Sequence, residues 1–144
     1  MTQRNEMETT FLSLAENESF ARVVIAAFAV QLSPTMSEIA DIKTAVSEAV
    51  TNAIVHGYEG SCGQVTMRAV IEGATLTVVV EDKGKGIRDV SQAMEPFFTT
   101  HPEQERSGMG FSVMQTFMDA LHVESQPGSG TRVTMRKKIT GGLA

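Results

Sequence analysis

Residues 75–86 read TLTVVVEDKGKG and hold the most informative pattern of this sequence of 144 residues. The first part is rich in β-branched side chains, which predicts a buried strand. The strand ends at Asp82, and Gly84 and Gly86 then allow the backbone to turn or to pass close to a ligand. An aspartate and glycines at the end of a strand also suit an ordinary turn, in which the carboxylate bonds its own backbone. The motif therefore indicates a binding site only together with other residues.

A polar pair on a predicted helix is the second part of the pattern. Residues 35–38 read TMSE, which has the spacing of a capping box and predicts a helix that runs to His56 and stops at Gly57. Glu48 and Asn52 lie four residues apart, so they share one face of this helix. The asparagine oxygen suits Mg²⁺, and the carboxylate can accept a proton from a hydroxyl group or water. A solvated helix face would carry the same pair, and both interpretations stay open.

The rest of the N-terminal half predicts one strand and one further helix. Residues 7–14 contain an alternating stretch, which is typical of an edge strand. Asn17 is expected to cap a helix that runs to about Leu32, and Pro34 then breaks it. The apolar sides of the two helices are expected at Phe20, Val24, Ala27 and Phe28 in the first, and at Ile39, Ile42, Val46, Ala49, Val50, Ala53 and Ile54 in the second.

The C-terminal half predicts two pairs of strands around one helix. Residues 64–71 and 75–81 form a pair with a tight turn at Gly73, and residues 123–125 and 131–139 form a closing hairpin. The helix between the pairs is marked by Phe111, Met114, Phe117, Met118 and Leu121. This order predicts an α+β fold, in which helices cover one face of a mixed, mostly antiparallel sheet. The length fits a single domain over residues 1–144.

A long segment without periodicity, at about residues 83–107, is typical of a functional or mobile lid, and part of it could be a short helix. It leads into residues 107–110, SGMG, whose backbone amides at a helix start offer an anion site. An ordinary helix cap with flexible glycines has the same sequence.

Two further residues are candidates for the site. Arg106 could contact a phosphate or be solvated. Thr131 could bond the edge of a base or be an ordinary strand threonine.

Several familiar functions are excluded by missing patterns. The sequence has no phosphate-binding loop of the Gly-x-x-x-x-Gly-Lys type, no complete dinucleotide fingerprint, no nucleophile elbow and no structural zinc spacing. A net charge of −5 argues against general binding of nucleic acid. The lone Cys62 cannot form an internal disulfide, and neither a signal pattern nor a membrane-spanning apolar run is found. We therefore expect a cytoplasmic protein.

Four short motifs, in order along the chain, resemble the four boxes of the Bergerat ATP-binding superfamily, which includes gyrase, Hsp90 chaperones, histidine kinases and MutL. The motifs are Glu48-x-x-x-Asn52, Asp82-x-Gly84-x-Gly86, Gly108-x-Gly110 and Gly130-Thr131. Longer stretches, NESFAR at 17–22, VSEAVTNAI at 46–54 and ERSGMGF at 105–111, resemble the sporulation anti-sigma F factors essentially from end to end. The resemblance implies a small serine kinase that holds sigma-F inactive and phosphorylates an anti-anti-sigma partner on serine.

The same resemblance implies roles for individual residues, with ATP, ADP and Mg²⁺ as the bound species. Glu48 would be the catalytic base and Asn52 the Mg²⁺ ligand. The adenine would lie against Asp82, with help from Gly84, Gly86 and Thr131. Phosphates would be held by Thr99, Thr100, Arg106, Ser107, Gly108, Met109 and Gly110. Arg22 would meet sigma-F and the anti-anti-sigma protein, and the chain would form a homodimer.

Three other functions are weighed against this one. A nucleotide-gated module that sequesters its partner without significant kinase activity would have the same fold. A related anti-sigma kinase could serve another sigma factor, such as a stress-response factor. The catalytic domain of a histidine kinase is disfavoured, because no helix pair with a phosphoacceptor histidine precedes the domain.

Overall fold

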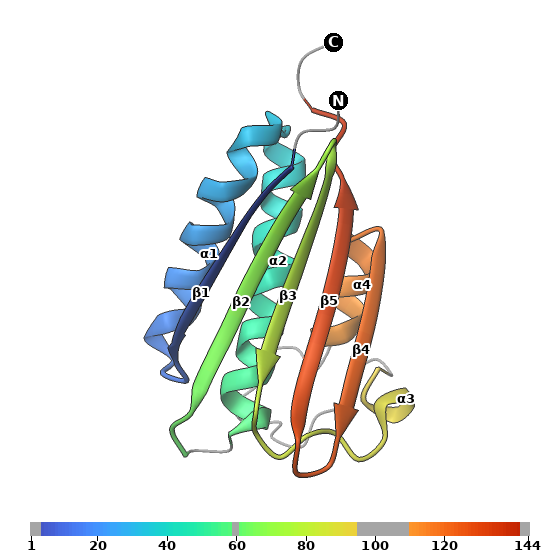
Figure 1. Ribbon diagram of the computed structural model, residues 1–144. Helices are drawn as coiled ribbons and strands as arrows, with labels where there is room; N and C mark the ends of the chain where they lie inside the picture. The colour runs from blue at the N-terminus through green and yellow to red at the C-terminus, as the bar shows by residue number, and fades with distance from the viewer. Residues whose placement is uncertain (1–3, 59–60, 95–109, 142–144) are drawn as a thin grey trace.

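The computed structural model describes residues 4–58, 61–94 and 110–141, which form one sheet with helices packed on one of its faces (Figure 1). The sheet has five strands in the order β1-β2-β3-β5-β4, and all neighbours are antiparallel. The predicted α+β fold is confirmed, and the parallel pairing that the prediction allowed does not occur among the described strands. The strands are β1 (Arg4–Leu12), β2 (Gln64–Glu72), β3 (Thr75–Asp82), β4 (Ala120–Gln126) and β5 (Gly130–Lys138).

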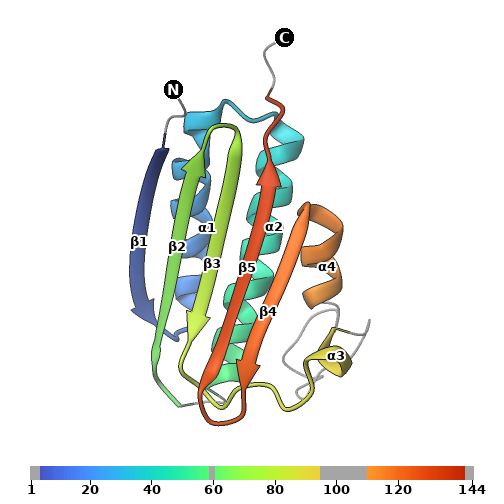
Figure 2. The same ribbon diagram turned by 45° about the vertical axis from the view of Figure 1, so that its right-hand side comes forward.

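Three helices make up most of the second layer. Helices α1 (Glu16–Ala29) and α2 (Met36–Asn52) pack against each other, and α4 (Gly110–Phe117) packs against α2 (Figure 2). The shorter segments are a 3₁₀ turn η1 (Val30–Leu32), a π-helical turn η2 (Ala53–Gly57) and α3 (Val90–Ala93). Helix α3 lies within residues 83–107, where the sequence allowed a short helix. Within the described ranges, no helix is long and apolar enough to cross a membrane.

The long central helix starts and stops where its sequence predicts. The Thr35 hydroxyl accepts the backbone N–H of Glu38 at 3.0 Å, and the Glu38 carboxylate accepts that of Thr35 at 2.9 Å. This reciprocal pair is the expected capping box. The helical run ends at Gly57, but its last turn is π-helical, a feature often found next to functional sites.

The alternation of β3 decides where the proposed site lies. Leu76, Val78, Val80 and Asp82 are buried, whereas the residues between them are less so. Since alternate side chains of a strand share a face, Asp82 continues the face that the helices cover. Its carboxyl group therefore lies between the two layers.

The start of α1 differs from the prediction. Asn17 does not cap the helix, because Ala15 occupies the cap position. The Asn17 amide instead donates to the Leu12 carbonyl at 2.9 Å and ties the helix to the end of β1. A polar side chain in the first turn can bond backbone on either side of it, and sequence spacing alone does not distinguish the two.

The buried face of α1 is also turned by one residue from the prediction. Its fully buried residues are Ala21, Ile25 and Ala29, whereas Phe20 is 46% exposed. Of the predicted positions, Val24 and Phe28 are partly buried against the core. Ala27, also predicted for this face, is exposed. Apolar residues lie on both sides of α1, so the helical period alone does not decide which side packs against α2.

Helix α4 is shorter than predicted, because Leu121 belongs to β4. The helix ends at Phe117, whose carbonyl accepts the Lys137 ammonium group at 2.8 Å. Two residues later the Asp119 N–H bonds the Arg136 carbonyl at 2.8 Å, and pairing with β5 begins. Leu121 faces the core from the strand, so its apolar character suited either element.

The carboxylate of Glu38 provides a test of how the C-terminal residues are held. Besides Thr35, it accepts the backbone N–H groups of Thr140 at 2.8 Å and Gly141 at 3.1 Å. These bonds hold the pKa of Glu38 at about 2, below its usual 4.5. Because the folded pKa is lowered, the stabilisation is complete above the unfolded pKa and is lost as the pH falls from about 4.5 to 2.

We predict that Glu38→Gln lowers the free energy of unfolding at pH 7 by about 1 kcal/mol, a value reduced for the partial exposure of the group. The difference from the wild type should shrink steadily as urea unfolding is repeated from pH 5 down to pH 3. The matched control is Glu8→Gln, at an exposed position of β1, which should leave the pH dependence unchanged. A Glu38→Gln effect that stays constant over this range would contradict the assignment.

Candidate functional site

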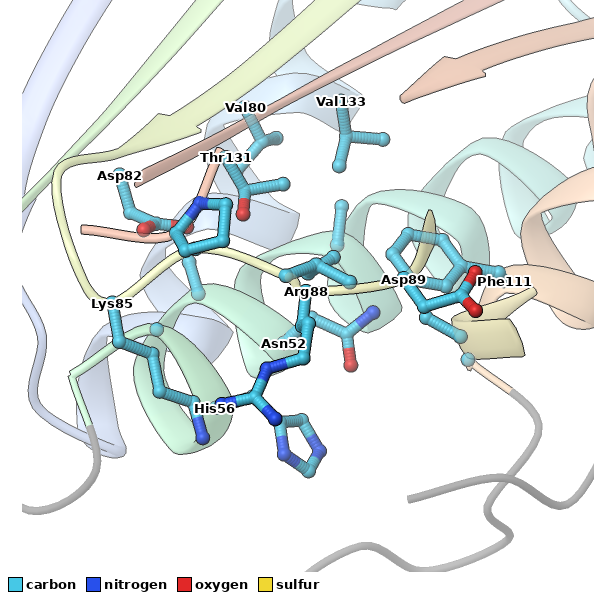
Figure 3. Close-up of a pocket in the computed structure, with 18 of the residues that line it drawn as sticks. Asn52, His56, Val80, Asp82, Lys85, Arg88, Asp89, Phe111, Thr131 and Val133 are labelled. Carbon is cyan, nitrogen blue, oxygen red and sulfur yellow. The ribbon is translucent and has the colours of Figure 1, made fainter. Parts of the chain in front are cut away.

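A cavity of about 500 Å³ opens between the helical layer and the sheet, where β3 ends (Figure 3). Its walls come from the end of α2 with η2, the end of β3, the start of β5, the loop after β3, α3 and the start of α4. The lining residues are Ala49, Asn52, Ala53, His56, Gly57, Val80, Asp82, Lys85, Gly86, Ile87, Arg88, Asp89, Gln92, Ala93, Gly110, Phe111, Pro127, Thr131 and Val133.

Asp82 is the buried acid of this cavity, with 6% of its surface exposed. Its carboxylate accepts the Gly84 N–H at 2.9 Å and also the backbone N–H of Thr131. Burial raises the pKa of the carboxyl group, and these two hydrogen bonds oppose the rise. The Asx-type bond to Gly84 is the turn that the sequence allowed, yet the carboxyl group also lines the cavity. A buried, fixed acceptor of this kind can recognise a hydrogen-bond donor of a ligand.

The two glycines after Asp82 are required by neighbouring backbone. A Cβ on Gly84 would lie 2.0 Å from the Gly57 carbonyl oxygen. Gly86 has a φ of +77°, and its Cβ would lie 2.0 Å from the Gln126 carbonyl oxygen. The close approach that the sequence indicated is therefore made to the protein itself. It packs the exit of β3 between η2 and the turn that joins β4 to β5.

The predicted helix pair is only partly in the cavity. Asn52 lines it, and so does His56 one turn further along (Figure 3). Glu48 is partly buried one turn before Asn52 and is not among the residues that line the cavity in the described part of the chain.

Thr131 lines the cavity from the start of β5, opposite Asp82 in the strand register. Its hydroxyl lies 2.8 Å from that of Ser125 on β4. The Ser125 hydroxyl also accepts the Ile87 N–H at 2.7 Å, so it ties the loop after β3 to the hairpin. Ser125 was not predicted as part of the site, although the alternation of β4 places it on the inward face.

Five of the predicted nucleotide-binding residues line the cavity: Asn52, Asp82, Gly86, Gly110 and Thr131. Gly84 is not among the lining residues. Gly110 is buried and begins α4. The other predicted residues of this group lie outside the described residues: Thr99, Thr100, Arg106, Ser107, Gly108 and Met109.

A cationic side of the cavity was missed by the sequence analysis. In Figure 3 the side chains of Lys85 and Arg88 extend toward the side where the His56 ring lies. Two permanent cations beside a cavity of an acidic protein favour an anionic ligand such as a phosphate. A signal existed in the sequence, because residues 83–88 carry three basic side chains around the glycines.

The apolar walls complete a site that is suited to a flat, partly charged molecule. Val80 and Val133 lie two residues from Asp82 and Thr131 on their strands, so each pair shares a face. Phe111 adds an aromatic ring from α4. Apolar walls with a few fixed polar groups are typical of a small-molecule site.

The chemistry of the donor set also limits how a metal ion could be held. Within the described ranges, no group of three or more His, Cys, Asp or Glu residues could hold a metal ion. The amide oxygen of Asn52 is a hard donor that suits Mg²⁺. Since Mg²⁺ in such sites takes few protein ligands and completes its shell with phosphate oxygens and water, Asn52 fits an ion that arrives with a nucleotide.

Arg22 lies on α1 and is not among the lining residues of the cavity. Its guanidinium group lies 3.6 Å from the Glu18 carboxylate, and Glu18 in turn accepts a hydrogen bond from the Ser47 hydroxyl on α2. The arginine is therefore held at a partly exposed position of the first helix, at a different place from the residues that line the cavity.

Comparison with known proteins agrees with this geometry. Residues 11–137 match the family model of the histidine kinase-like ATPase domain. The chain is 63% identical over 139 residues to an anti-sigma F factor of Thermoanaerobacter sp. (strain X514), which covers 96% of this chain and 97% of the relative. It is 58% identical over 135 residues to an anti-sigma F factor of Clostridium acetobutylicum, covering 94% of each.

Two solved structures share the fold at low sequence identity. One contains the RsbU and RsbW domains of Rv1364c from Mycobacterium tuberculosis, with a TM-score of 0.69 and 20% identity over 94% of this chain and 32% of that one. The other is a histidine kinase domain from the blue-light activated kinase EL346 of Erythrobacter litoralis, with a TM-score of 0.56 and 21% identity over 85% of this chain and 61% of that one.

The fold is thus that of a histidine kinase-like ATPase domain. The chain belongs to this family and, within it, to the anti-sigma F factors. The resemblance found in the sequence is confirmed.

We predict that Gly86→Ala destabilises the protein more than Gly128→Ala does. Both glycines have positive φ, +77° and +81°, so both alanines carry a strain of about 1–2 kcal/mol. Only the Cβ at position 86 would also meet backbone, whereas nothing lies within 4 Å of that at position 128. The additional loss should be at least about 1 kcal/mol in urea unfolding. Equal losses would show that the contact with Gln126 does not constrain the loop.

Proposed function

We propose that this chain is an anti-sigma factor that sequesters sigma-F and, as an ATP-dependent protein serine kinase, phosphorylates and inactivates its anti-anti-sigma antagonist. The observation that carries the proposal is the cavity at the end of β3, where Asp82, Thr131 and Asn52 meet in a chain that matches anti-sigma F factors over nearly its full length. The family itself implies binding of ATP. Serine specificity, the sigma-F partner and Mg²⁺ are parts of the proposal.

Each wall of the cavity is given a role in nucleotide binding. The buried carboxylate of Asp82 would accept a hydrogen bond from the exocyclic amine of adenine, and the Thr131 hydroxyl would bond the edge of the base. Asn52 would hold Mg²⁺, which offsets the charge of the phosphates when it is bound. The phosphates would also contact residues 99–100 and 106–110. The cationic side at Lys85 and Arg88 supports an anionic ligand.

Glu48 is proposed as the base that accepts the proton of the attacking serine. Phosphoryl transfer needs little covalent chemistry from a protein, so a positioned carboxylate near the hydroxyl supplies the remaining step. Glu48 lies one turn before Asn52 on α2, so substrate serine would approach from the side of α2 that continues the cavity.

A second candidate function is sequestration without significant kinase activity, and the position of Glu48 outside the lining of the cavity favours it. Incubation of the chain with γ-labelled ATP and the candidate antagonist separates the two. Label on a serine of the antagonist supports the kinase. Absence of label with intact sigma binding supports the module.

The identity of the sigma partner is tested separately. Capture of sigma factors from the native cell on the immobilised chain should retain sigma-F. Retention of a stress-response sigma factor instead would assign the chain to another regulatory branch.

We also propose that the chain is a homodimer, which sedimentation of the purified protein tests. Partner choice is expected to depend on whether ATP or ADP is bound, and equal partner affinities in both nucleotide states would exclude such a switch.

We predict that Glu48→Gln and Asn52→Ala separate chemistry from binding. Glu48→Gln should lower the rate of transfer to the antagonist by about 10²–10⁴-fold, with nucleotide affinity nearly unchanged, because only the base is removed. Asn52→Ala should weaken Mg·ATP binding by about tenfold or more, because the ion loses its protein ligand. Titration with labelled nucleotide and single-turnover transfer measure the two effects. Equal losses of nucleotide affinity in both variants would contradict the division of roles.

We predict that Arg22→Ala weakens binding of sigma-F and of the antagonist without changing affinity for ATP. The guanidinium group is partly exposed on α1, away from the residues that line the cavity. Loss of one charged contact at the centre of an interface should lower affinity by about tenfold or more. Arg4→Ala, on the exposed edge of β1, is the control that removes a charge elsewhere. If nucleotide affinity falls as well, the substitution disturbs the fold, and the assignment of Arg22 to a partner surface is contradicted.

A further inference from the structure

Tyr58 connects three segments of backbone next to the cavity. Its hydroxyl donates to the Gln64 carbonyl at 2.6 Å, at the start of β2. The same oxygen accepts the Lys83 N–H at 2.9 Å, directly after Asp82. One side chain from the end of η2 therefore joins the start of β2 to the exit of β3.

A backbone hydrogen bond strengthens this connection. The Gly57 carbonyl accepts the Lys85 N–H at 2.8 Å. The N–H groups of Lys83 and Lys85 are thus bonded to Tyr58 and Gly57, two successive residues at the end of η2. The N–H between them, that of Gly84, bonds the Asp82 carboxylate itself at 2.9 Å. The three amides that follow Asp82 all serve to fix this turn.

The tyrosine ring is itself held in place. A Cβ on Gly63 would lie 2.2 Å from a ring carbon, so the ring rests directly on this glycine. The Tyr58 carbonyl accepts both the N–H of Ser61 at 2.9 Å and its hydroxyl at 2.5 Å. The position of the hydroxyl group that accepts the Lys83 N–H is therefore fixed by the contacts of the ring and of the Tyr58 backbone.

We propose that Tyr58 is a positioning residue for base selection: it holds the turn after β3 so that the Asp82 carboxylate faces the exocyclic amine of adenine. Tyr58 does not line the cavity, and so it acts through the backbone of Lys83 and not by contact with the ligand. This inference rests on the proposed nucleotide site. A hydrogen bond depends steeply on direction, so a small rotation of the carboxylate weakens recognition of the amine.

The measurement is the ratio of affinities for ADP and inosine diphosphate, whose base carries a carbonyl oxygen in place of the amine. A fixed carboxylate accepts from the amine and repels the oxygen, so the wild type should prefer ADP strongly. In Tyr58→Phe the ring remains while the hydroxyl is lost, and the freed backbone groups can bond water. The preference for ADP should fall by about tenfold, through weaker ADP and stronger inosine diphosphate binding.

Asn17→Ala is the matched control, because it removes one side-chain hydrogen bond of 2.9 Å on α1, outside the cavity. It should lower the melting temperature to a similar degree and leave the affinity ratio unchanged. If Tyr58→Phe does not fold, Gly63→Ala decides the question, since its methyl group displaces the ring while the hydroxyl is kept. It should also lower the ratio.

Two negative results have different meanings. A wild type that prefers ADP, with the same preference in Tyr58→Phe, would overturn the inference and leave the proposed nucleotide site intact. A wild type that binds both nucleotides equally or not at all would overturn the proposed recognition by Asp82, and the role of Tyr58 with it.

Discussion

The hydrogen bond from the Lys85 N–H to the Gly57 carbonyl joins the end of the helical layer to the exit of β3, and the site depends on this junction. At this point the two backbones approach so closely that Gly84 has no room for a side chain. A Cβ on Gly57 would likewise lie 2.9 Å from the Asp82 carboxyl group. Glycine on both sides is therefore the condition under which a buried acid can sit at the layer interface. The cavity lies next to this junction, and Gly57, Asp82 and Lys85 line it.

Sequence reasoning located this site well where spacing determines geometry. The capping box at Thr35 fixed the start of α2, and helical spacing then put Asn52 on the face that lines the cavity. Asp82 and Thr131 were joined in one site only by the resemblance to the four motifs, and the structure pairs them across β3 and β5. For Asn52, one local rule determines where the side chain points.

Other features depended on tertiary contacts that no local pattern encodes. The Asn17 side chain could bond the backbone of its own helix or that of the strand before it, and in the structure it bonds the Leu12 carbonyl of the strand. Leu121 fitted the period of a helix but was captured by pairing with β5. Tyr58 and Ser125 act by joining segments that are distant in sequence, and their hydroxyl partners become visible only in three dimensions. The sequence left open whether Gly84 and Gly86 serve a turn or approach a ligand, and in the structure both lie against protein backbone while Gly86 also lines the cavity.

The π-helical turn of η2 has a consequence for how this chain can vary in length. It places one extra residue in the last turn before Gly57, so the carbonyl of Gly57 and the ring of Tyr58 reach the exit of β3 in the right phase. Deletion or insertion of a residue there would turn both groups away together. The β4–β5 turn is tied to the same loop from the other side, because the Gly128 N–H donates to the Lys85 carbonyl at 2.6 Å. The count of residues from Asn52 to Tyr58 should therefore stay constant during evolution.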